Sequence, residues 1–583
     1  MVDPGTIIAV VTIAYTGAIK AWSTFQTALN YDDDSANLVV RLEIEKFRLQ
    51  TWALNVGLTK GTFDTSLHPI HELIAERLRR ITKLFDEAEG VRNSFGLVAS
   101  DAAKIQPEKV HNIVSGMAAS IRYMGIKLDI EEKPKELNSK NISNRIRWAL
   151  SSKSKFAKLI SNIEDNLDKL DALLTETQRR SAKDNWKQIN IVMAGNVPME
   201  QIEIIQQALR PGITDNASKS IVGIEALLER KAISSLTLTH HLRGARSLQK
   251  RDLKEFILST DLAAKNRVLA APKEWAQAAL GPGPFLLERK RYDPNISAPD
   301  KRVLKTRLDR LILLLSSVRS DDFRAFQAVG YCDEPSSFSW WLVFQFPSYD
   351  SRIVSLRNVF SLKEKPSLEN RFGLASLLSK TVAELFNSGW MHKCIRSDNV
   401  LFPEVCAART PVPEERIPMV TSPYLAGFEY SRQDTEAVTI DKGKHLHEIE
   451  SAIYRHPDYQ GEAASGYRMK YDIYSFGLVL AEIALWTPLL KFLDAKGAIA
   501  ADGVQLSSKM ESFHQVEAVE LKNRVLGRVN GELGFRVGSR FQHAVRWCLT
   551  MSEEEDEEEW HPALRFHNHV VAPLERCAAL SDK

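Results

Sequence analysis

The sequence predicts a multidomain protein in which an all-α helix bundle precedes an α+β domain with two lobes. In the first part, apolar residues recur at three- and four-residue steps, which is the spacing of one helix face. In the second part, short alternating segments that favour strands come before long apolar segments that favour helices. We expect the bundle at 1–210, a helical linker or brace at 211–270, and the two-lobed domain at 271–583, with lobes at 271–347 and 348–583.

Composition is that of a globular protein. A chain of 583 residues has room for about two to four domains, and 44% apolar with 26% charged residues is ordinary for such domains. The net charge of +3 excludes neither nucleic acid nor membrane as a partner, because local patches decide such binding. The five cysteines are odd in number and show no metal-ligand spacing. We therefore expect a reducing, cytoplasmic location and no metal site.

The N-terminal segment is uncharged from Ile7 to Ile19. This run is shorter than the roughly 20 apolar residues that span a bilayer, and only Asp3 precedes it, whereas a signal peptide begins with basic residues. Lys20 and Trp22 extend it to the length of a membrane-inserting helix. We expect a helix that is buried in the bundle at rest and enters the membrane on release. Its membrane-active residues would be Ile7, Ile8, Val10, Val11, Ile13, Ala14 and Ile19.

Three more amphipathic helices are predicted downstream. Apolar residues share one helix face over 38–56, over 70–91 and over 156–174, and charged residues take the opposite faces. This pattern is typical of a helix bundle.

The segment from 133 to 158 is strongly basic, and Glu136 is its only acidic residue. Each basic residue close to an anionic leaflet contributes about 1 kcal/mol, so the segment could dock the bundle on acidic lipid, or it is a solvated helix face and loop. Nucleic acid is not expected, because stacking aromatic residues are missing. The basic patch consists of Lys133, Lys135, Lys140, Arg145, Arg147, Lys153, Lys155 and Lys158.

Two segments of the bundle, Arg41–Trp52 and Arg145–Leu150, resemble a known family when taken with the opening apolar helix. The resemblance is to the fungal HeLo domain of HET-S-like prion-inhibition and propagation proteins, and it covers about residues 1–210. It implies an all-α bundle whose first helix is expelled into the membrane on activation. It also implies a role in heterokaryon incompatibility and programmed cell death. A C-terminal amyloid motif, which the HET-S protein carries, is not recognisable here.

The segment Trp390–Phe402 resembles the catalytic loop of a protein kinase. That loop runs His-Arg-Asp, four residues, then Asn. Here His392, Lys393 and Asn399 keep the frame, but Cys394 stands where the catalytic Asp belongs. A kinase needs a carboxylate there to orient the substrate hydroxyl and accept its proton, so the resemblance implies a kinase-like fold without its catalytic base.

Further kinase motifs follow in the expected order. At the Asp-Phe-Gly motif, Gly427 replaces the Asp that binds magnesium, and only Phe428 remains. Pro457 stands in a segment that resembles Ala-Pro-Glu. Asp472 begins a long apolar segment in which it would cap the backbone of the catalytic loop, and the segment itself would be a buried helix. His392, Phe428, Pro457 and Asp472 are thus the expected structural residues of the kinase-like fold.

The small lobe is expected to lack its phosphate-binding parts. Phe285–Lys290 alternates as a strand, and Lys290 is either the phosphate-binding lysine or a surface charge. An amphipathic helix at 301–319 offers only Asp309 to pair with that lysine. No Gly-x-Gly-x-x-Gly precedes the strand, and Gly281–Pro284 is a stiff turn instead.

Two more strands are expected in this lobe, at Phe323–Gly330 and Trp340–Phe346. They would lead into a hinge at residues 346–348. Lys290 and Asn399 remain as vestigial positions through which ATP would bind, and no cofactor is expected.

We expect a signalling or regulated cell-death protein in which a pseudokinase controls a membrane-active bundle, and which is not an enzyme. It would move from the cytoplasm to the plasma membrane on activation, with anionic lipid, protein partners or further copies of itself bound through the bundle. Two alternatives remain open: an atypical kinase that binds ATP, and a non-lethal interaction scaffold. An acidic run, Glu553–Glu559, is a solvated loop or an inhibitory contact for the basic segment.

Overall fold

The computed structural model divides the chain into two compact units, Met1–Leu228 (unit 1) and Glu229–Lys583 (unit 2). The residues that the structure describes are 3–30, 35–86, 97–100, 113, 147–150, 152–179, 181–182, 204–205, 208, 250–258, 265–281, 283–316, 323–347, 351–363, 365–405, 420–433, 448–460, 466–493, 506, 509–551 and 562–579.

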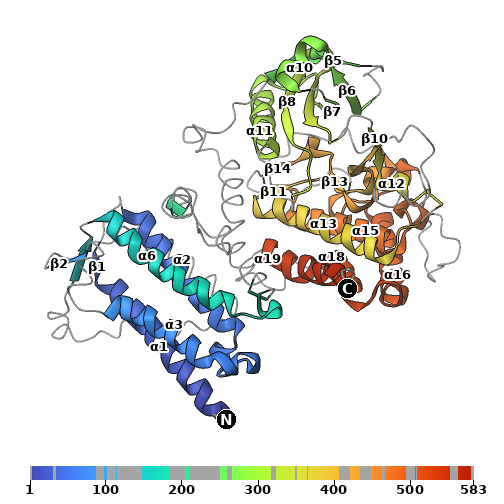
Figure 1. The fold of residues 1–583 in the computed structure, drawn as a ribbon. Coiled ribbons are helices and arrows are strands. Elements are labelled where there is room, and N and C mark those ends of the chain that lie inside the picture. The colour runs from blue at the N-terminus through green and yellow to red at the C-terminus, as the bar shows by residue number, and fades with distance from the viewer. Residues whose placement is uncertain are drawn as a thin grey trace. The chain divides into compact units, whose positions relative to one another are not determined.

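Among the residues of unit 1 that the structure describes, there are four long helices (Figure 1). They are α1 (Pro4–Ala28), α2 (Ala36–Asn55), α3 (His71–Asp86) and α6 (Lys153–Ala172). Helix α1 packs along α3, and α2 and α3 both pack against α6. The three helices predicted downstream of the N-terminal segment are confirmed as α2, α3 and α6, because their apolar stripes meet in one core.

Helix α1 begins at a capped N-terminus. The Asp3 carboxylate accepts a hydrogen bond from the Thr6 backbone N–H at 3.2 Å, and Pro4 occupies the first turn, where its missing N–H costs nothing. The helix ends at Leu29, which is extended. One face is buried, and its residues are Ile7, Val11, Ala14, Ala18, Trp22 and Phe25.

The predicted helical region is confirmed, but unit 1 also contains a small three-stranded sheet, so it is not exclusively α as predicted. Strand β3 (Arg147–Leu150) lies between β1 (Leu29–Asn30), to which it is parallel, and β2 (Leu97–Ser100), to which it is antiparallel. The sheet joins segments more than a hundred residues apart in the chain. Strands of two to four residues leave almost no periodic pattern, so helical spacing could not reveal them.

Unit 2 contains a six-stranded sheet with the order β4-β8-β9-β7-β6-β5. All neighbours are antiparallel except β4 and β8, which are parallel. The strands are β4 (Lys250–Arg251), β5 (Phe256–Ile257), β6 (Arg267–Pro272), β7 (Phe285–Arg291), β8 (Ala328–Glu334) and β9 (Ser339–Gln345). Helix α11 (Ala298–Ser316) packs on β8, and the short α10 (Glu274–Leu280) follows β6.

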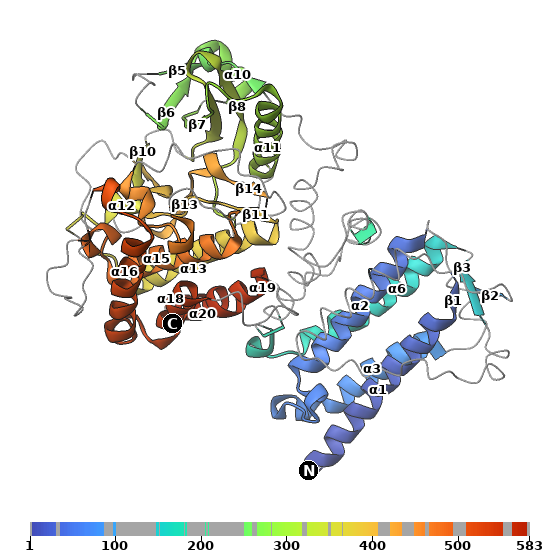
Figure 2. The same ribbon diagram turned by 180° about the vertical axis from the view of Figure 1, so that it is seen from behind.

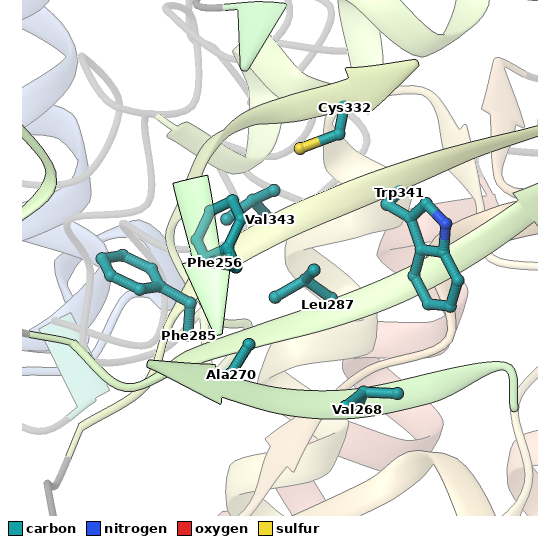
Figure 3. Packing of buried hydrophobic residues seen from close by; sticks show 8 residues of the cluster. All are labelled: Phe256, Val268, Ala270, Phe285, Leu287, Cys332, Trp341 and Val343. Carbon is teal, nitrogen blue, oxygen red and sulfur yellow. The ribbon is translucent and has the colours of Figure 1, made fainter. Parts of the chain in front are cut away.

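One face of this sheet carries an apolar core (Figure 3). Its side chains come from β5, β6, β7, β8 and β9, and the aromatic rings of Phe256 and Phe285 meet edge to face at 5.7 Å. The cluster consists of Phe256, Val268, Ala270, Phe285, Leu287, Cys332, Trp341 and Val343.

The sheet begins earlier in the chain than the sequence predicted. Within the segment 211–270, assigned to a helical brace, residues 250–258 and 265–270 form β4, a 3-10 turn at Leu253–Glu255, β5 and the first part of β6. These strands bury Phe256, Val268 and Ala270 in the core, so packing decided a segment whose local pattern was ambiguous. Likewise, β8 runs over Ala328–Glu334 instead of Phe323–Gly330.

The second part of unit 2 is mainly helical (Figures 1 and 2). Its helices are α12 (Leu356–Val359), α13 (Leu368–Asn387), α14 (Ile449–Ala452), α15 (Met469–Leu485), α16 (Gln515–Arg528), α17 (Gly534–Val537), α18 (Ser539–Thr550), α19 (Pro562–Phe566) and α20 (Ala572–Ala579). Two small antiparallel sheets lie in it: β10 (Ser351–Ser355), β12 (Val400–Val405) and β13 (Tyr424–Leu425) form one, and β11 (Trp390–Met391) and β14 (Arg432–Gln433) the other.

Helix α15 is the centre of this part. Every residue from Tyr471 to Leu485 is buried, which confirms the predicted buried helix, and α18 and α13 pack against it. Gly477 allows the close approach of α18, because a Cβ there would lie 2.5 Å from the Cβ of Cys548. A mixed sheet followed by helices is compatible with the predicted two-lobed domain. The acidic run Glu553–Glu559 lies outside the described residues.

Candidate functional site

Helix α15 holds the backbone of the segment Trp390–Phe402 through Asp472. The buried Asp472 carboxylate accepts hydrogen bonds from the backbone N–H groups of His392 at 2.6 Å and Lys393 at 2.9 Å, and from the hydroxyl of Tyr467 at 2.6 Å. Burial raises the pKa of Asp472 to about 6, against the lowering effect of these three donors. Asp472 thus accepts from the backbone of the loop, as the sequence predicted. Lys393 takes a left-handed conformation with φ of 66°.

The His392 ring is part of the core beneath the loop. It packs against the Phe428 ring with 4.6 Å between centroids, and its Nδ1 accepts a hydrogen bond from the Cys394 N–H at 3.2 Å. Burial lowers the pKa of His392 to about 3, so the imidazole is neutral. Its role is structural, since a neutral buried ring that accepts a backbone N–H holds the loop in shape.

Cys394 is the residue that the kinase-like interpretation places at the position of the catalytic carboxylate. The residue is partly exposed, and burial of its thiol among neighbouring atoms raises the pKa to about 11, against the lowering effect of the nearby Arg396 charge. A thiol with this pKa stays protonated at neutral pH. It can neither accept a proton from a hydroxyl nor act as a thiolate.

Gly427 and Asn399 lie against each other. Gly427 has a φ of +84°, and a Cβ built on it would lie 2.2 Å from Nδ2 of Asn399. An aspartate at 427 would therefore require Asn399 to move. The amide of Asn399 is already engaged, because Nδ2 donates to the Cys394 carbonyl at 2.8 Å and Oδ1 accepts from Arg267 at 2.9 Å.

A carboxylate from the sheet lies at the same point. Glu288 on β7 is buried and accepts the Gly427 N–H, with Oε2 at 3.0 Å and Oε1 at 3.2 Å. Arg267 on β6 pairs with Glu288 through Nε at 2.8 Å and Nη2 at 2.7 Å. Sequence reasoning missed both residues. Alternation along β7 could have indicated Glu288, since it shares a face with Lys290.

Lys290 lies farther along the same face of β7. Its ammonium donates to the backbone carbonyl of Glu429 and lies 5.8 Å from the centroid of the Tyr430 ring. Asp309, which the sequence offered as its partner, pairs with Lys305 at 3.0 Å instead. Helix α11 reaches the other part of unit 2 through Arg310, whose Nη1 donates to Oε1 of Gln433 at 2.7 Å. Glu288, not Lys290, is therefore the β7 side chain beside Gly427 and Asn399.

Pro457 begins a 3-10 helix, Pro457–Tyr459, and is buried. Just before it, the Tyr454 hydroxyl donates to Oε1 of Glu482 on α15 at 2.7 Å, and the Leu489 N–H donates to the same oxygen at 2.6 Å. Burial raises the pKa of Glu482 to about 8. These contacts anchor the segment on α15.

In unit 1, the predicted membrane-active helix is only half covered. Ile7, Ile8, Val10, Val11, Ile13, Ala14 and Ile19 all lie in α1. Ile7, Val11, Ala14 and Ile19 are buried, Ile8 and Val10 are half-buried, and Ile13 is 72% exposed. The helix predicted to be buried in the bundle at rest is thus buried on the face that packs mainly on α3, while Ile13 on its other face is exposed.

Helix α1 also meets the length and composition of a membrane span over Pro4–Gln26, a test that core helices of soluble proteins pass as well. The span is longer than the run Ile7–Ile19 because it also includes residues 4–6 before that run and residues 20–26 after it.

The basic patch is described only in part. Lys153, Lys155 and Lys158 are exposed on the first turns of α6, and Arg147 lies in β3. Lys133, Lys135, Lys140 and Arg145 lie outside the described residues.

The segment Arg41–Trp52 forms most of α2 and buries charges against α6. Arg41 pairs with Glu164 at 2.7 Å, and Arg48 pairs with Asp168 at 2.5 Å and with Asp171. Glu45 on the same helix is buried, and burial raises its pKa to about 7 although Arg48 lowers it. Sequence reasoning missed these pairs, because their partners lie more than a hundred residues away.

Comparison with known proteins finds a match within one of the two units. The HeLo family model, described as prion-inhibition and propagation, matches residues 5–204, within unit 1. This match supports the HeLo part of the prediction. It does not extend to unit 2, whose kinase-like interpretation stays a prediction. No curated protein matches the chain.

Proposed function

We propose that this chain is a regulated cell-death protein of the heterokaryon-incompatibility type, in which unit 2 controls a membrane-active unit 1. The observation that carries the proposal is the outer face of α1. Ile13 is 72% exposed there, Thr6, Ala9 and Thr16 are exposed beside it, and no charge interrupts this face before Lys20. A helix that is apolar on its packed face and uncharged on its outer face can pass from protein to lipid without burying a charge.

The way α1 is held supports its release. Its strongest packing is against α3, where the Phe85 ring meets Trp22 at 4.9 Å and Phe25 at 5.1 Å between centroids. Apolar packing is non-directional, and lipid tails replace it at little cost. Trp and Tyr rings favour the membrane interface, and α1 carries Tyr15 near its middle and Trp22 in its second half.

Anionic lipid is the proposed partner of the bundle. Lys153, Lys155 and Lys158 are exposed at the start of α6, and charges close to an acidic leaflet add about 1 kcal/mol each. The protein would reside in the cytoplasm and move to the plasma membrane on activation, where several copies could assemble through the bundle.

Unit 2 is proposed to be kinase-like and without catalysis. The interpretation is supported by the buried Asp472 beneath the backbone of the loop, and by the packing of His392 on Phe428. Phosphate transfer would need a carboxylate at Cys394 and a metal ligand at Gly427. Cys394 carries a thiol and Gly427 has no side chain, so neither group is supplied. No cofactor is proposed.

Leakage of dye from vesicles tests the effector. The fragment 1–228, which ends where unit 1 ends, is expected to release dye from phosphatidylserine-containing vesicles and less from neutral ones. Circular dichroism must first show that the fragment retains its helices. A folded fragment that leaves both kinds of vesicle intact would contradict the proposal and favour the interaction scaffold.

Phosphate transfer tests unit 2. The purified chain with magnesium and labelled ATP is expected to transfer no phosphate to itself or to a generic protein substrate. Magnesium-dependent transfer that disappears in Lys290→Met would instead establish the atypical kinase.

A further inference from the structure

Four polar side chains from the sheet and α11 of unit 2 cross to its helical part. Arg267 reaches Asp398 and Asn399, Glu288 reaches Gly427, and the two contacts come from neighbouring strands. Lys290 reaches the carbonyl of Glu429, and Arg310 reaches Gln433. The two parts of unit 2 are thus joined by the chain's own polar side chains.

Arg267 is the centre of these contacts. Its guanidinium donates to Glu288 through Nε and Nη2, to the Asp398 carbonyl through Nη1 at 3.2 Å, and to Oδ1 of Asn399 through Nη2 at 2.9 Å. The planar guanidinium suits such a site, because its donors are fixed in direction and it remains charged. The side chain of Glu288 is 3% exposed and that of Arg267 is 23% exposed, so solvent screens the pair only weakly.

The position of Arg267 is informative because of what surrounds it. Asn399 and residue 427 are the two positions that hold metal ions in a catalytic kinase, and the lysine of the third strand contacts the phosphates. Here a glutamate, Glu288, extends from that strand toward Gly427, and a cation of the protein lies between Glu288 and Asn399. The charges are therefore reversed relative to such a site. Strand β7 supplies the Glu288 carboxylate at this point, and the positive charge that a metal ion would supply comes from Arg267.

We propose that Arg267 is a built-in cation that takes the place of the metal ion and closes the two parts of unit 2 on each other without a ligand. The inference rests on the kinase-like interpretation of unit 2 and specifies what occupies its predicted metal-binding positions. A magnesium–nucleotide complex would have to displace Arg267 from both Glu288 and Asn399. Displacement would leave the buried Glu288 carboxylate without its cation, beside the anionic phosphates. The closed arrangement is therefore independent of nucleotide.

Substitution of Arg267 tests the closure. In Arg267→Met the side chain keeps its length and loses its charge, so we expect the amide protons of Gly427 and of residues 398–400 to exchange about tenfold to a hundredfold faster, as loss of hydrogen bonds to a charged group predicts. Arg267→Lys keeps the charge without the fork and should give an intermediate rate. The matched control is Arg302→Met, an exposed arginine on α11, which should leave these rates unchanged. The measurement is hydrogen exchange of the full chain read by mass spectrometry.

Two outcomes would overturn the inference. Equal exchange rates in Arg267→Met and Arg302→Met would show that Arg267 does not hold the parts together. Slower exchange of Gly427 in the parent chain on addition of magnesium–ATP would show that nucleotide stabilises the closed arrangement, which contradicts closure independent of nucleotide. If Arg267→Met does not fold, Arg267→Lys and Glu288→Gln supply the same comparison. Leakage by the fragment 1–228 is independent of all these variants, so failure of the closure leaves the proposed effector function standing, and the reverse.

Discussion

Helices α1 and α2 are neighbours in the chain but are held in unit 1 by different forces. Helix α2 buries Arg48 and Glu45 and is tied to α6 by ion pairs to Asp168 and Asp171. Helix α1 packs on α3 chiefly through apolar side chains, with the rings of Trp22, Phe25 and Phe85 in contact. Breaking a buried ion pair strands a charge, whereas separating apolar faces only exposes surface that lipid can cover. If unit 1 acts on membranes as proposed, this difference makes α1 the helix expected to leave, while the α2–α6 pair stays intact.

The comparison predicts that the largest loss of stability follows from α2. Arg48→Met removes the cation that Glu45, Asp168 and Asp171 share. Breaking a fully buried pair costs about 3–5 kcal/mol, and this is an upper bound here because Asp168 and Asp171 are partly exposed and solvent screens their pairs with Arg48. Chemical denaturation should show this loss for unit 1. The control Arg79→Met, whose side chain is 55% exposed on α3, should change stability by about 0.5 kcal/mol at most. If the two variants unfold at the same denaturant concentration, the ion pairs do not set the stability of α2.

Unit 2 should be more sensitive at Asp472 than at the vestigial site positions. Asp472→Ala leaves the His392 and Lys393 N–H groups without an acceptor, at about 1–3 kcal/mol for each buried group. Calorimetry should give a lower melting temperature for Asp472→Ala than for Lys290→Ala or Asn399→Ala. Equal decreases in all three variants would mean that the loop cap is no more important than the residues of the cleft.

The stability of unit 2 should depend on pH through the buried carboxyl group of Glu482. The pKa of Glu482 is raised from 4.5 to about 8 in the folded chain, so the folded state binds this proton more tightly than the unfolded state. Its contribution to stability is therefore greatest below pH 4.5 and falls as the pH rises toward 8, by at most about 1.4 kcal/mol per pH unit for one proton.

Glu482→Gln tests this dependence because an amide oxygen can still accept from Tyr454 and Leu489. Urea midpoints measured from pH 5 to pH 8 should fall less steeply for the variant than for the parent. Parallel curves would exclude Glu482 as the source of the slope.

The smallest effect on stability is expected for the substitution that should most affect the membrane. Ile13 is 72% exposed on α1, so a charge introduced by Ile13→Glu should change the free energy of unfolding by about 0.5 kcal/mol at most. The same charge costs about 2.5–3.5 kcal/mol in the middle of a membrane helix, so leakage by the fragment 1–228 should be lost.

Ala14→Glu is the informative neighbour, since Ala14 is 5% exposed and the charge would be forced into the packed face. It should abolish leakage and also loosen the bundle, whereas Ile13→Glu should abolish leakage alone. If a folded Ile13→Glu fragment releases dye as well as the parent fragment, α1 is a core helix and does not enter the membrane.

Much of the architecture could be read from local pattern. The apolar stripes of α2, α3 and α6 and the uninterrupted apolar run of α15 each report a buried face within a few helical turns, and such periodicity is contained in neighbouring residues. The position of Asp472 before that run, eighty residues after His392, was recognisable only through the resemblance to kinases.

The tertiary structure alone decided which charges meet. Arg48 and Asp171 lie 123 residues apart, and Arg267 and Asn399 lie 132 residues apart. No periodicity links residues at these separations, so the contacts of Arg48 with Asp171 and of Arg267 with Asn399 could not be predicted from the sequence. The strands β4, β5 and the first part of β6 were likewise taken for a helical brace. The sequence by itself determined where apolar faces form, because that depends on neighbours along the chain. The partner of a buried charge depends on which distant backbone the fold brings within about 3 Å of it, and only packing determines that.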